Sequence, residues 1–320
     1  MKAWVNYRNG NYNVCLNLIN GTKIRQNSLD YFLPSTIESC DIKITNRCYG
    51  GTSCKFCHEG SSPFGKHGDI LSPSWLDKLH PYTELAIGGG NPLCHPDLDK
   101  FLLKCRERLH IPNMTVNQIH FEKEFDRVKK LYDEHLIFGL GISLVKVTPE
   151  FIEKVKQIPS AVIHVINGIV TEEELRQLRF NGLKILILGY KVFRRGEKLY
   201  QTQSKETEEK KAMLKGLLPV MLEGKWFEVI SFDNLSLSQL DLRSYLSKED
   251  WQQFYMGNDG LDSEEDCLSA TYFVDMVERK FAINSCSKER YDLLNTAEEM
   301  YEFLWKDKLT KLRERAAKNS

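Results

Sequence analysis

The central part of the chain alternates short apolar runs with amphipathic stretches, a pattern that predicts successive β-strand and α-helix units. Six runs have strong β character, and each is separated from the next by a segment long enough for a crossover helix. The predicted strands are residues 42–45, 85–88, 114–118, 137–144, 161–166 and 183–188. This order predicts an α/β fold in which parallel strands form a partial (β/α)6, TIM-like barrel.

Three of the predicted crossover helices carry start signals. Ser72-Pro73 and Thr148-Pro149 each place a hydroxyl residue before a proline, the arrangement that favours a first helical turn. Thr171, followed three residues later by Glu174, predicts a capping box at the start of another helix. These signals support the alternation of strands and helices independently of the hydrophobic pattern.

The two ends of the chain follow different patterns from the centre. Asn9-Gly10 and Asn20-Gly21 interrupt β-like runs and predict an N-terminal β-hairpin or meander, which we expect to cap the barrel mouth. After the sixth strand we expect a mixed extension that packs on the core. It contains a basic segment (191–198), two helices (204–217 and 296–318) and two strands (226–232 and 270–277). We therefore divide the chain into a cap (1–39), a barrel core (40–191) and a C-terminal extension (192–320).

Charge and hydropathy limit the partners that this chain would bind. Its 320 residues include 44 Lys and Arg and 44 Asp and Glu, so the overall field indicates neither nucleic acid nor an anionic membrane as a partner. No stretch approaches the roughly 18 apolar residues of a membrane span, and the first ten residues lack an apolar export signal. We expect a cytoplasmic protein.

Three of the nine cysteines lie within ten residues of one another, directly after the first predicted strand. Cys48, Cys54 and Cys57 form the pattern Cys-x5-Cys-x2-Cys in a loop. Three thiolates on a four-iron cluster leave one iron open to another ligand, and this favours an iron–sulfur site. Two alternatives stay open: unliganded thiols, or a structural zinc site that takes its fourth ligand from Cys40, His58 or His67.

The ends of the later strands carry glycine and polar residues at the edge where barrel enzymes place their active sites. Gly88-Gly89-Gly90-Asn91-Pro92 follows the second strand and exposes backbone groups to a ligand. At the ends of strands three to six lie Asn117, Ser143, Asn167 and Gly189. Helix capping is the alternative role for Asn117, and simple packing is the alternative for Ser143.

The cysteine loop, with Phe56 immediately before the third cysteine, resembles the cluster loop of the radical S-adenosylmethionine (radical SAM) superfamily. Gly89-Gly90-Asn91-Pro92 resembles the superfamily's Gly-Gly-Glu-Pro motif, although Asn91 replaces the acid. The commonest superfamily spacing is Cys-x3-Cys-x2-Cys, and the extra length here falls around Gly50-Gly51. The resemblance covers roughly residues 40–190 and extends to a compact group of radical SAM proteins from bacteria and phages.

The resemblance implies that Cys48, Cys54 and Cys57 hold a [4Fe-4S] cluster that reductively cleaves S-adenosylmethionine (SAM). The product is a 5′-deoxyadenosyl radical that abstracts hydrogen from a small-molecule, nucleotide or peptide substrate. It also implies an external one-electron donor of the flavodoxin or ferredoxin kind. The implied SAM contacts are Phe56, Gly89, Gly90, Asn91, Pro92, Asn117, Ser143, Asn167 and Gly189.

A basic segment after the sixth strand has several readings. It contains Lys191, Arg194 and Arg195. Three interpretations stay open: these side chains bind an acidic group of the substrate, they bind the SAM carboxylate, or they belong to a solvated loop. For the chain as a whole, a non-enzymatic iron–sulfur or zinc sensor is the main alternative to a radical SAM enzyme. An ordinary barrel enzyme with incidental cysteines is a third hypothesis.

Overall fold

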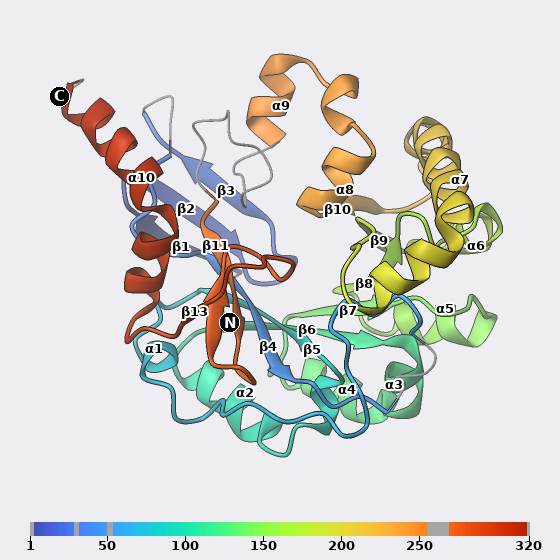
Figure 1. Cartoon of the computed structure of the whole chain (residues 1–320), viewed down its shortest axis with the longest axis horizontal. Helices are drawn as coiled ribbons and strands as arrows, with labels where there is room; N and C mark the ends of the chain where they lie inside the picture. Colours follow the sequence, from blue (N-terminus) through green and yellow to red (C-terminus); the bar gives the residue numbers. More distant parts are fainter. Residues whose placement is uncertain (1–2, 29–31, 50–53, 255–268, 319–320) are drawn as a thin grey trace.

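A ten-stranded and a three-stranded sheet form the framework of the computed structural model, which describes residues 3–28, 32–49, 54–254 and 269–318 (Figure 1). The six predicted strands of the barrel core are confirmed, and neighbours in the chain are parallel neighbours in the large sheet. They are β4 (Ser39–Thr45), β5 (Glu84–Gly89), β6 (Ile111–Asn117), β7 (Gly139–Ser143), β8 (Ala161–Ile166) and β9 (Lys184–Leu188).

The C-terminal extension adds one parallel strand to each end of this series. β10 (Val229–Phe232) pairs with β9, and β11 (Thr271–Asp275) pairs with β4. Two short antiparallel strands, β12 (Lys280–Ala282) and β13 (Tyr291–Asp292), continue the sheet beyond β11. The extension therefore completes the sheet on both sides of the predicted core, and this mixed α/β architecture confirms the predicted fold class.

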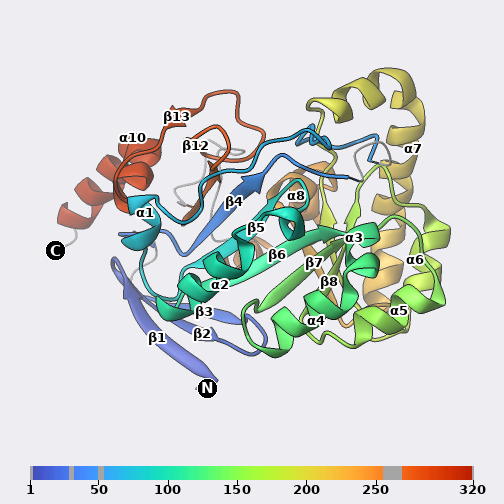
Figure 2. The same ribbon diagram turned by 90° about the horizontal axis from the view of Figure 1, so that it is seen from below.

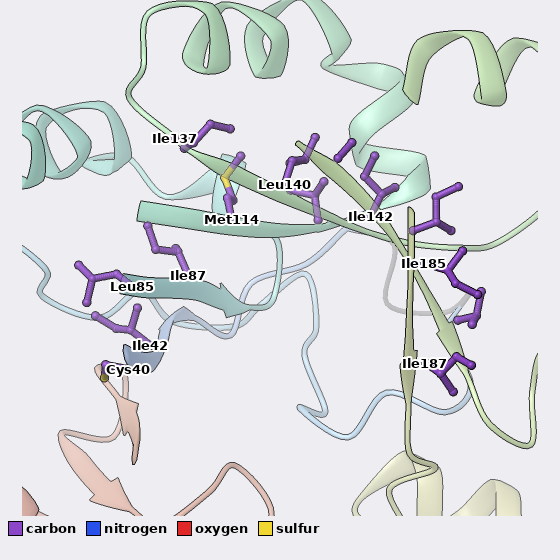
Figure 3. Close-up of a cluster of buried hydrophobic side chains, with 14 of the residues drawn as sticks. Cys40, Ile42, Leu85, Ile87, Met114, Ile137, Leu140, Ile142, Ile185 and Ile187 are labelled. Carbon is purple, nitrogen blue, oxygen red and sulfur yellow. The ribbon is translucent and has the colours of Figure 1, made fainter. Parts of the chain in front are cut away.

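Alternation along the strands separates the apolar core from a polar inner face. Every second residue points toward the helices and is fully buried, as Ile42, Ile87, Leu140 and Ile185 illustrate (Figure 3). The residues between them, for example Lys43, point to the other face. Because one face packs under helices, burial of its apolar side chains holds the sheet together and leaves the inner face free for chemistry.

The helices lie mainly on the outer side of the parallel strands, as two perpendicular views show (Figures 1 and 2). Thr148 caps its helix and Thr171 forms the predicted capping box, whereas Pro73 rather than Ser72 is the N-cap of its helix and makes no side-chain cap bond. The helices are α1 (Ser74–Asp77), η1 (Pro92–Cys94), α2 (Leu98–Glu107), α3 (Gln118–Lys123), α4 (Phe125–Asp133), α5 (Pro149–Lys156), α6 (Glu172–Leu178), α7 (Arg195–Glu223), α8 (Asn234–Gln239), η2 (Leu242–Tyr245), α9 (Lys248–Phe254) and α10 (Ala297–Lys318).

The N-terminal segment forms an antiparallel meander of β1 (Trp4–Asn9), β2 (Tyr12–Asn17) and β3 (Lys23–Gln26). Its polar contacts reach Glu38 and Glu84, which lie at the amino ends of β4 and β5. The Tyr12 hydroxyl donates to Glu38 Oε1 at 2.6 Å, and Lys23 Nζ donates to Glu84 Oε2 at 2.6 Å. The expectation that this segment caps the barrel mouth is therefore wrong, because these contacts fix it at the opposite edge of the strands.

Among the described residues, no helix combines the length and the apolar character that crossing a membrane requires.

Candidate functional site

A cavity of about 280 Å³ lies at the carboxyl ends of the parallel strands. Its wall is built from strand residues that point away from the helix-covered face, together with the cysteine loop and segments of the C-terminal extension. Inward-facing members include Lys43 of β4, Thr115 and Asn117 of β6, and His164 of β8. The fold therefore gathers residues from distant parts of the chain around one space at the edge that the sequence indicated.

Cys48, Cys54 and Cys57 all line this cavity. The side-chain amide of Asn117 donates to Cys54 Sγ at 3.4 Å, and His120 Nε2 lies 3.3 Å from Cys48 Sγ. Gly50 and Gly51, which carry the extra length of the loop, lie outside the described residues. Within the described parts of the chain, no group of three or more His, Cys, Asp or Glu side chains has the spacing of a single-ion metal site.

The glycines of the turn after β5 have different roles. Gly89 has a φ of +109°, and a Cβ there would lie 2.4 Å from the Thr45 carbonyl oxygen. At Gly90 a Cβ would lie 2.2 Å from the Arg47 carbonyl oxygen, and the Gly90 amide donates to Thr45 O at 2.7 Å. Both glycines therefore let the turn pack on the start of the cysteine loop. At Gly88, no atom of the described residues lies within 4 Å of the Cβ position, and this glycine lines the cavity.

The structure brings most of the other predicted site residues to the cavity but not all. Phe56, Gly89, Gly90, Asn117, Ser143 and Gly189 line it. Asn91 is 3% exposed and its side-chain oxygen caps η1 by accepting from the Leu93 amide at 3.2 Å. Pro92 is buried in the first turn of η1, and the side-chain amide of Asn167 donates to Gln239 at 3.2 Å. None of these three side chains is among the residues that line the cavity.

The side chains proposed as a fourth zinc ligand lie in three different settings. Cys40 is fully buried in the core on the helix-covered face, and burial raises the pKa of its thiol well above its usual value. The imidazole of His67 is hydrogen-bonded to the Thr45 hydroxyl at 2.9 Å, and His58 pairs with Glu59 at 3.3 Å. Of the three, His58 alone lines the cavity.

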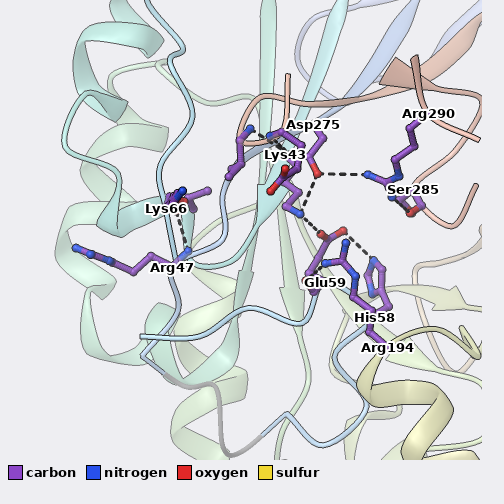
Figure 4. A network of polar contacts seen from close by, with 12 residues as sticks. Lys43, Arg47, His58, Glu59, Lys66, Arg194, Asp275, Ser285 and Arg290 are labelled. Atoms are coloured by element: carbon purple, nitrogen blue, oxygen red, sulfur yellow. Dashed lines mark hydrogen bonds and ion pairs between the residues drawn. The ribbon is translucent and has the colours of Figure 1, made fainter. Parts of the chain in front are cut away.

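A buried ion network, which the sequence did not suggest, supports the cysteine loop from behind (Figure 4). Lys43 is 1% exposed, and its ammonium lies 3.0 Å from both Glu59 and Asp275. Arg290 also reaches Asp275, at 3.3 Å. Burial opposes ionisation of Glu59, but His58 and Lys43 outweigh that effect and hold the pKa of this carboxyl well below its usual value. The network joins β4, the cysteine loop and the end of β11.

His164 lies near the middle of β8 and also faces the cavity. Burial lowers the pKa of its imidazole from 6.5 to about 4, so the ring is neutral at physiological pH. On the neighbouring strand β7, a Cβ at Gly141 would lie 2.3 Å from the His164 ring. Polar residues at alternate positions of apolar strands, such as Lys43 and His164, are the sequence signal that would have found this inner face.

The basic segment after β9 is divided between the cavity and the surface. Lys191 and Arg195 line the cavity, whereas Arg194 is exposed and donates to the backbone oxygen of Glu59. Gly189, at the start of the segment, donates its amide to Asp233 at 2.9 Å. The interpretation of this segment as a solvated loop therefore applies to Arg194 but not to Lys191 and Arg195.

Comparison with known proteins finds a likeness in structure but not in sequence. No protein-family model matches the chain, and no curated protein matches it. The crystal structure of Streptococcus suis SuiB bound to S-adenosylmethionine matches with a TM-score of 0.57 at 9% identity, over 91% of this chain and 85% of SuiB. The chain shares the SuiB fold.

A second SuiB structure gives the same result. SuiB bound to the precursor peptide SuiA matches with a TM-score of 0.59 at 11% identity, over 93% of this chain and 87% of SuiB. The likeness therefore spans more than nine tenths of this chain and more than eight tenths of SuiB. At identities this low it establishes the fold alone.

Proposed function

We propose that this protein is a radical SAM enzyme. One observation carries the proposal: the three clustered cysteines and the ends of the parallel strands share one cavity, in a fold that it has in common with a SAM-binding protein. Neither the cysteine spacing nor the fold would be sufficient alone to assign this activity. One fold can host many functions, and three thiols can bind several metals. Their combination at the functional edge of a parallel barrel favours SAM chemistry.

The residues around the cavity fit these cofactors. Three thiols would hold three irons of a four-iron cluster and leave the fourth iron open to SAM. Gly88 leaves an open face on the wall, where a cofactor can approach the backbone. Ser61 Oγ and Arg195 Nε are buried without a hydrogen-bond partner among the described residues, although both side chains line the cavity. A bound group or an ordered water would satisfy these two polar atoms, and their place on the cavity wall favours a ligand.

In this proposal each part of the wall has its own role. Cys48, Cys54 and Cys57 hold a [4Fe-4S] cluster, and the Asn117 amide bond to Cys54 orients one thiolate. When bound, the cluster and SAM supply reductive cleavage of SAM to a 5′-deoxyadenosyl radical. Ser143 contacts the SAM ribose, while Phe56 and the Gly189 backbone contact the adenine. The chain holds SAM against the cysteine loop and excludes water from the cavity.

The proposed reaction needs two partners. An external one-electron donor of the flavodoxin or ferredoxin kind reduces the protein. The hydrogen donor is a substrate that enters the same cavity. SuiB binds a precursor peptide, and this supports a peptide as one substrate class beside small molecules and nucleotides.

The test is anaerobic reconstitution of the full chain with iron and sulfide, followed by iron counting and a 5′-deoxyadenosine assay under reductant. We expect about four irons per chain and 5′-deoxyadenosine that depends on both SAM and reductant. One zinc and no iron would instead support the sensor alternative. A fully loaded protein that forms no 5′-deoxyadenosine would contradict the proposed activity.

A further inference from the structure

The segment after β9 crosses the open side of the partial barrel. β9 and β4 lie at opposite ends of the six core strands, yet the segment contacts the cysteine loop that follows β4. It packs so closely that a Cβ on Gly196 would lie 3.3 Å from the Phe56 carbonyl oxygen. Arg194 lies beside Glu59 in the same region (Figure 4). The crossing places Lys191 and Arg195 on the cavity wall.

Lys191 and Arg195 are cations that the described part of the chain does not neutralise by ion pairs. Lys191 Nζ donates to Ser285 Oγ at 3.1 Å, and Arg195 Nη1 donates to the Ser61 backbone oxygen at 2.9 Å. Both acceptors are neutral. The carboxylates of Glu59 and Asp275 are already paired with Lys43 and Arg290, two cations for two anions, so they leave the charges of Lys191 and Arg195 uncompensated.

Two unsatisfied hydrogen-bond donors lie with these cations. Ser61 is 2% exposed, and its hydroxyl has no partner among the described residues although it lines the cavity. Arg195 Nε is also buried, and the described part of the chain offers it no hydrogen-bond partner. A guanidinium, an ammonium and a hydroxyl together form a donor set that suits an oxyanion, because each contributes N–H or O–H groups and two contribute charge.

We propose that Lys191, Arg195 and Ser61 bind an oxyanion of the substrate, either a carboxylate or a phosphate group. The proposal rests on the proposed function, in which SAM occupies the β5–β7 side of the cavity and its adenine reaches the Gly189 backbone, so that the charged side chains of Lys191 and Arg195 remain available to the substrate. Gly89, Gly90 and Asn117 lie on that SAM side. Lys191 and Arg195 follow β9, at the other end of the core sheet.

The test uses isothermal titration of the reconstituted, SAM-loaded protein with two probes, sodium phosphate and sodium succinate. We expect at least one probe to bind the wild type, and the stronger probe identifies the oxyanion class. Lys191→Ala and Arg195→Gln are each expected to weaken that probe by about tenfold or more, because each removes a charge-assisted hydrogen bond. Ser61→Ala is expected to weaken it by roughly threefold, without a cost in folding, since no partner is lost.

Lys198→Gln is the matched control. It removes one positive charge from an exposed position of α7, one turn beyond Arg195, and is expected to leave probe binding unchanged. The Kd for SAM is measured on every variant and is expected to stay at the wild-type value.

Three outcomes would overturn the oxyanion site. They are no binding of either probe to the wild type, equal weakening by Lys198→Gln, and loss of SAM affinity in step with probe affinity. The last would assign the cations to the SAM carboxylate. A failure of the radical SAM proposal would be recognised by a different result, namely that the reconstituted wild type contains no iron or forms no 5′-deoxyadenosine.

Discussion

Lys43 and Asp275 face each other across the parallel pairing of β4 with β11, and their Nζ and Oδ2 atoms lie 3.0 Å apart. Their side chains are 1% and 0% exposed. Removal of one partner from a buried ion pair is costly, because the remaining charge stays in a poorly solvated place. The pair therefore joins the C-terminal extension to the strand that leads into the cysteine loop.

Asp275→Asn is expected to lower the free energy of unfolding by about 3 kcal/mol, measured by urea denaturation. The substitution removes the charge but keeps the side-chain oxygen that accepts from the Val277 and Glu278 amides at 3.1 Å. Asp292→Asn is the control, because Asp292 forms an exposed pair with Lys280 at 2.8 Å. The decrease in the free energy of unfolding of Asp292→Asn should stay below about 1 kcal/mol. Equal losses in the two variants would contradict a special role for the buried network.

Stability should depend on pH through His164, whose pKa falls from 6.5 in the unfolded chain to about 4 in the folded chain. As pH falls, the unfolded chain binds the proton first. The contribution of the neutral His164 imidazole to the free energy of unfolding is therefore complete above about pH 6.5 and is lost as pH falls toward about 4. When the pH is lowered from 7 to 5, the free energy of unfolding of the wild type, measured by urea denaturation, should fall by about 2 kcal/mol more than that of His164→Gln. Identical pH profiles for the two proteins would show that this imidazole titrates normally.

Two glycines of the inner face should respond differently to alanine. A Cβ at Gly141 meets the His164 ring at 2.3 Å, so Gly141→Ala should destabilise the fold by about 2 kcal/mol. Gly88 has open space at its Cβ position, so Gly88→Ala should leave the midpoint of thermal unfolding unchanged or slightly raised. The same methyl group should raise the Kd for SAM by about tenfold, because it narrows the cavity. Unchanged SAM affinity in Gly88→Ala would count against SAM on that wall.

The cluster assignment is tested by Cys54→Ala, which should abolish both bound iron after reconstitution and SAM cleavage. Cys15→Ser is the control, because Cys15 belongs to β2 of the N-terminal meander, far along the chain from the cysteine loop. It should retain wild-type iron and activity. Iron content and SAM cleavage at the wild-type level in Cys54→Ala would contradict the assignment of Cys54 as a cluster ligand.

The core of the fold follows from local patterns. Each of the six parallel strands carries its own apolar run, so β4 to β9 are predictable one at a time. The positions of β10 and β11 are not, because pairing between distant segments leaves no local signal. For the same reason the sequence predicts a strand near 270–277 but does not indicate that Asp275 meets Lys43.

The site was predictable to the extent that it depends on strand ends. Cys48, Asn117 and Ser143 reach the cavity because carboxyl ends of parallel strands meet at one edge. Asn91 and Asn167 do not, because their amides are used by a cap and by Gln239. Such local hydrogen bonds compete with ligand binding and are not visible in a motif.

The pairing of Ser39 with Thr271 also sets an order of events in the cell. β4 is made early, but its second neighbour leaves the ribosome only after most of the chain has been synthesised. Until then one edge of β4 has unpaired backbone groups, which is the kind of surface that promotes aggregation and attracts chaperones. Lys43 also lacks Asp275 during this period. The side of β4 that supports the cysteine loop is therefore completed late, so the cavity that we propose for the cluster is still incomplete while most of the chain is being synthesised.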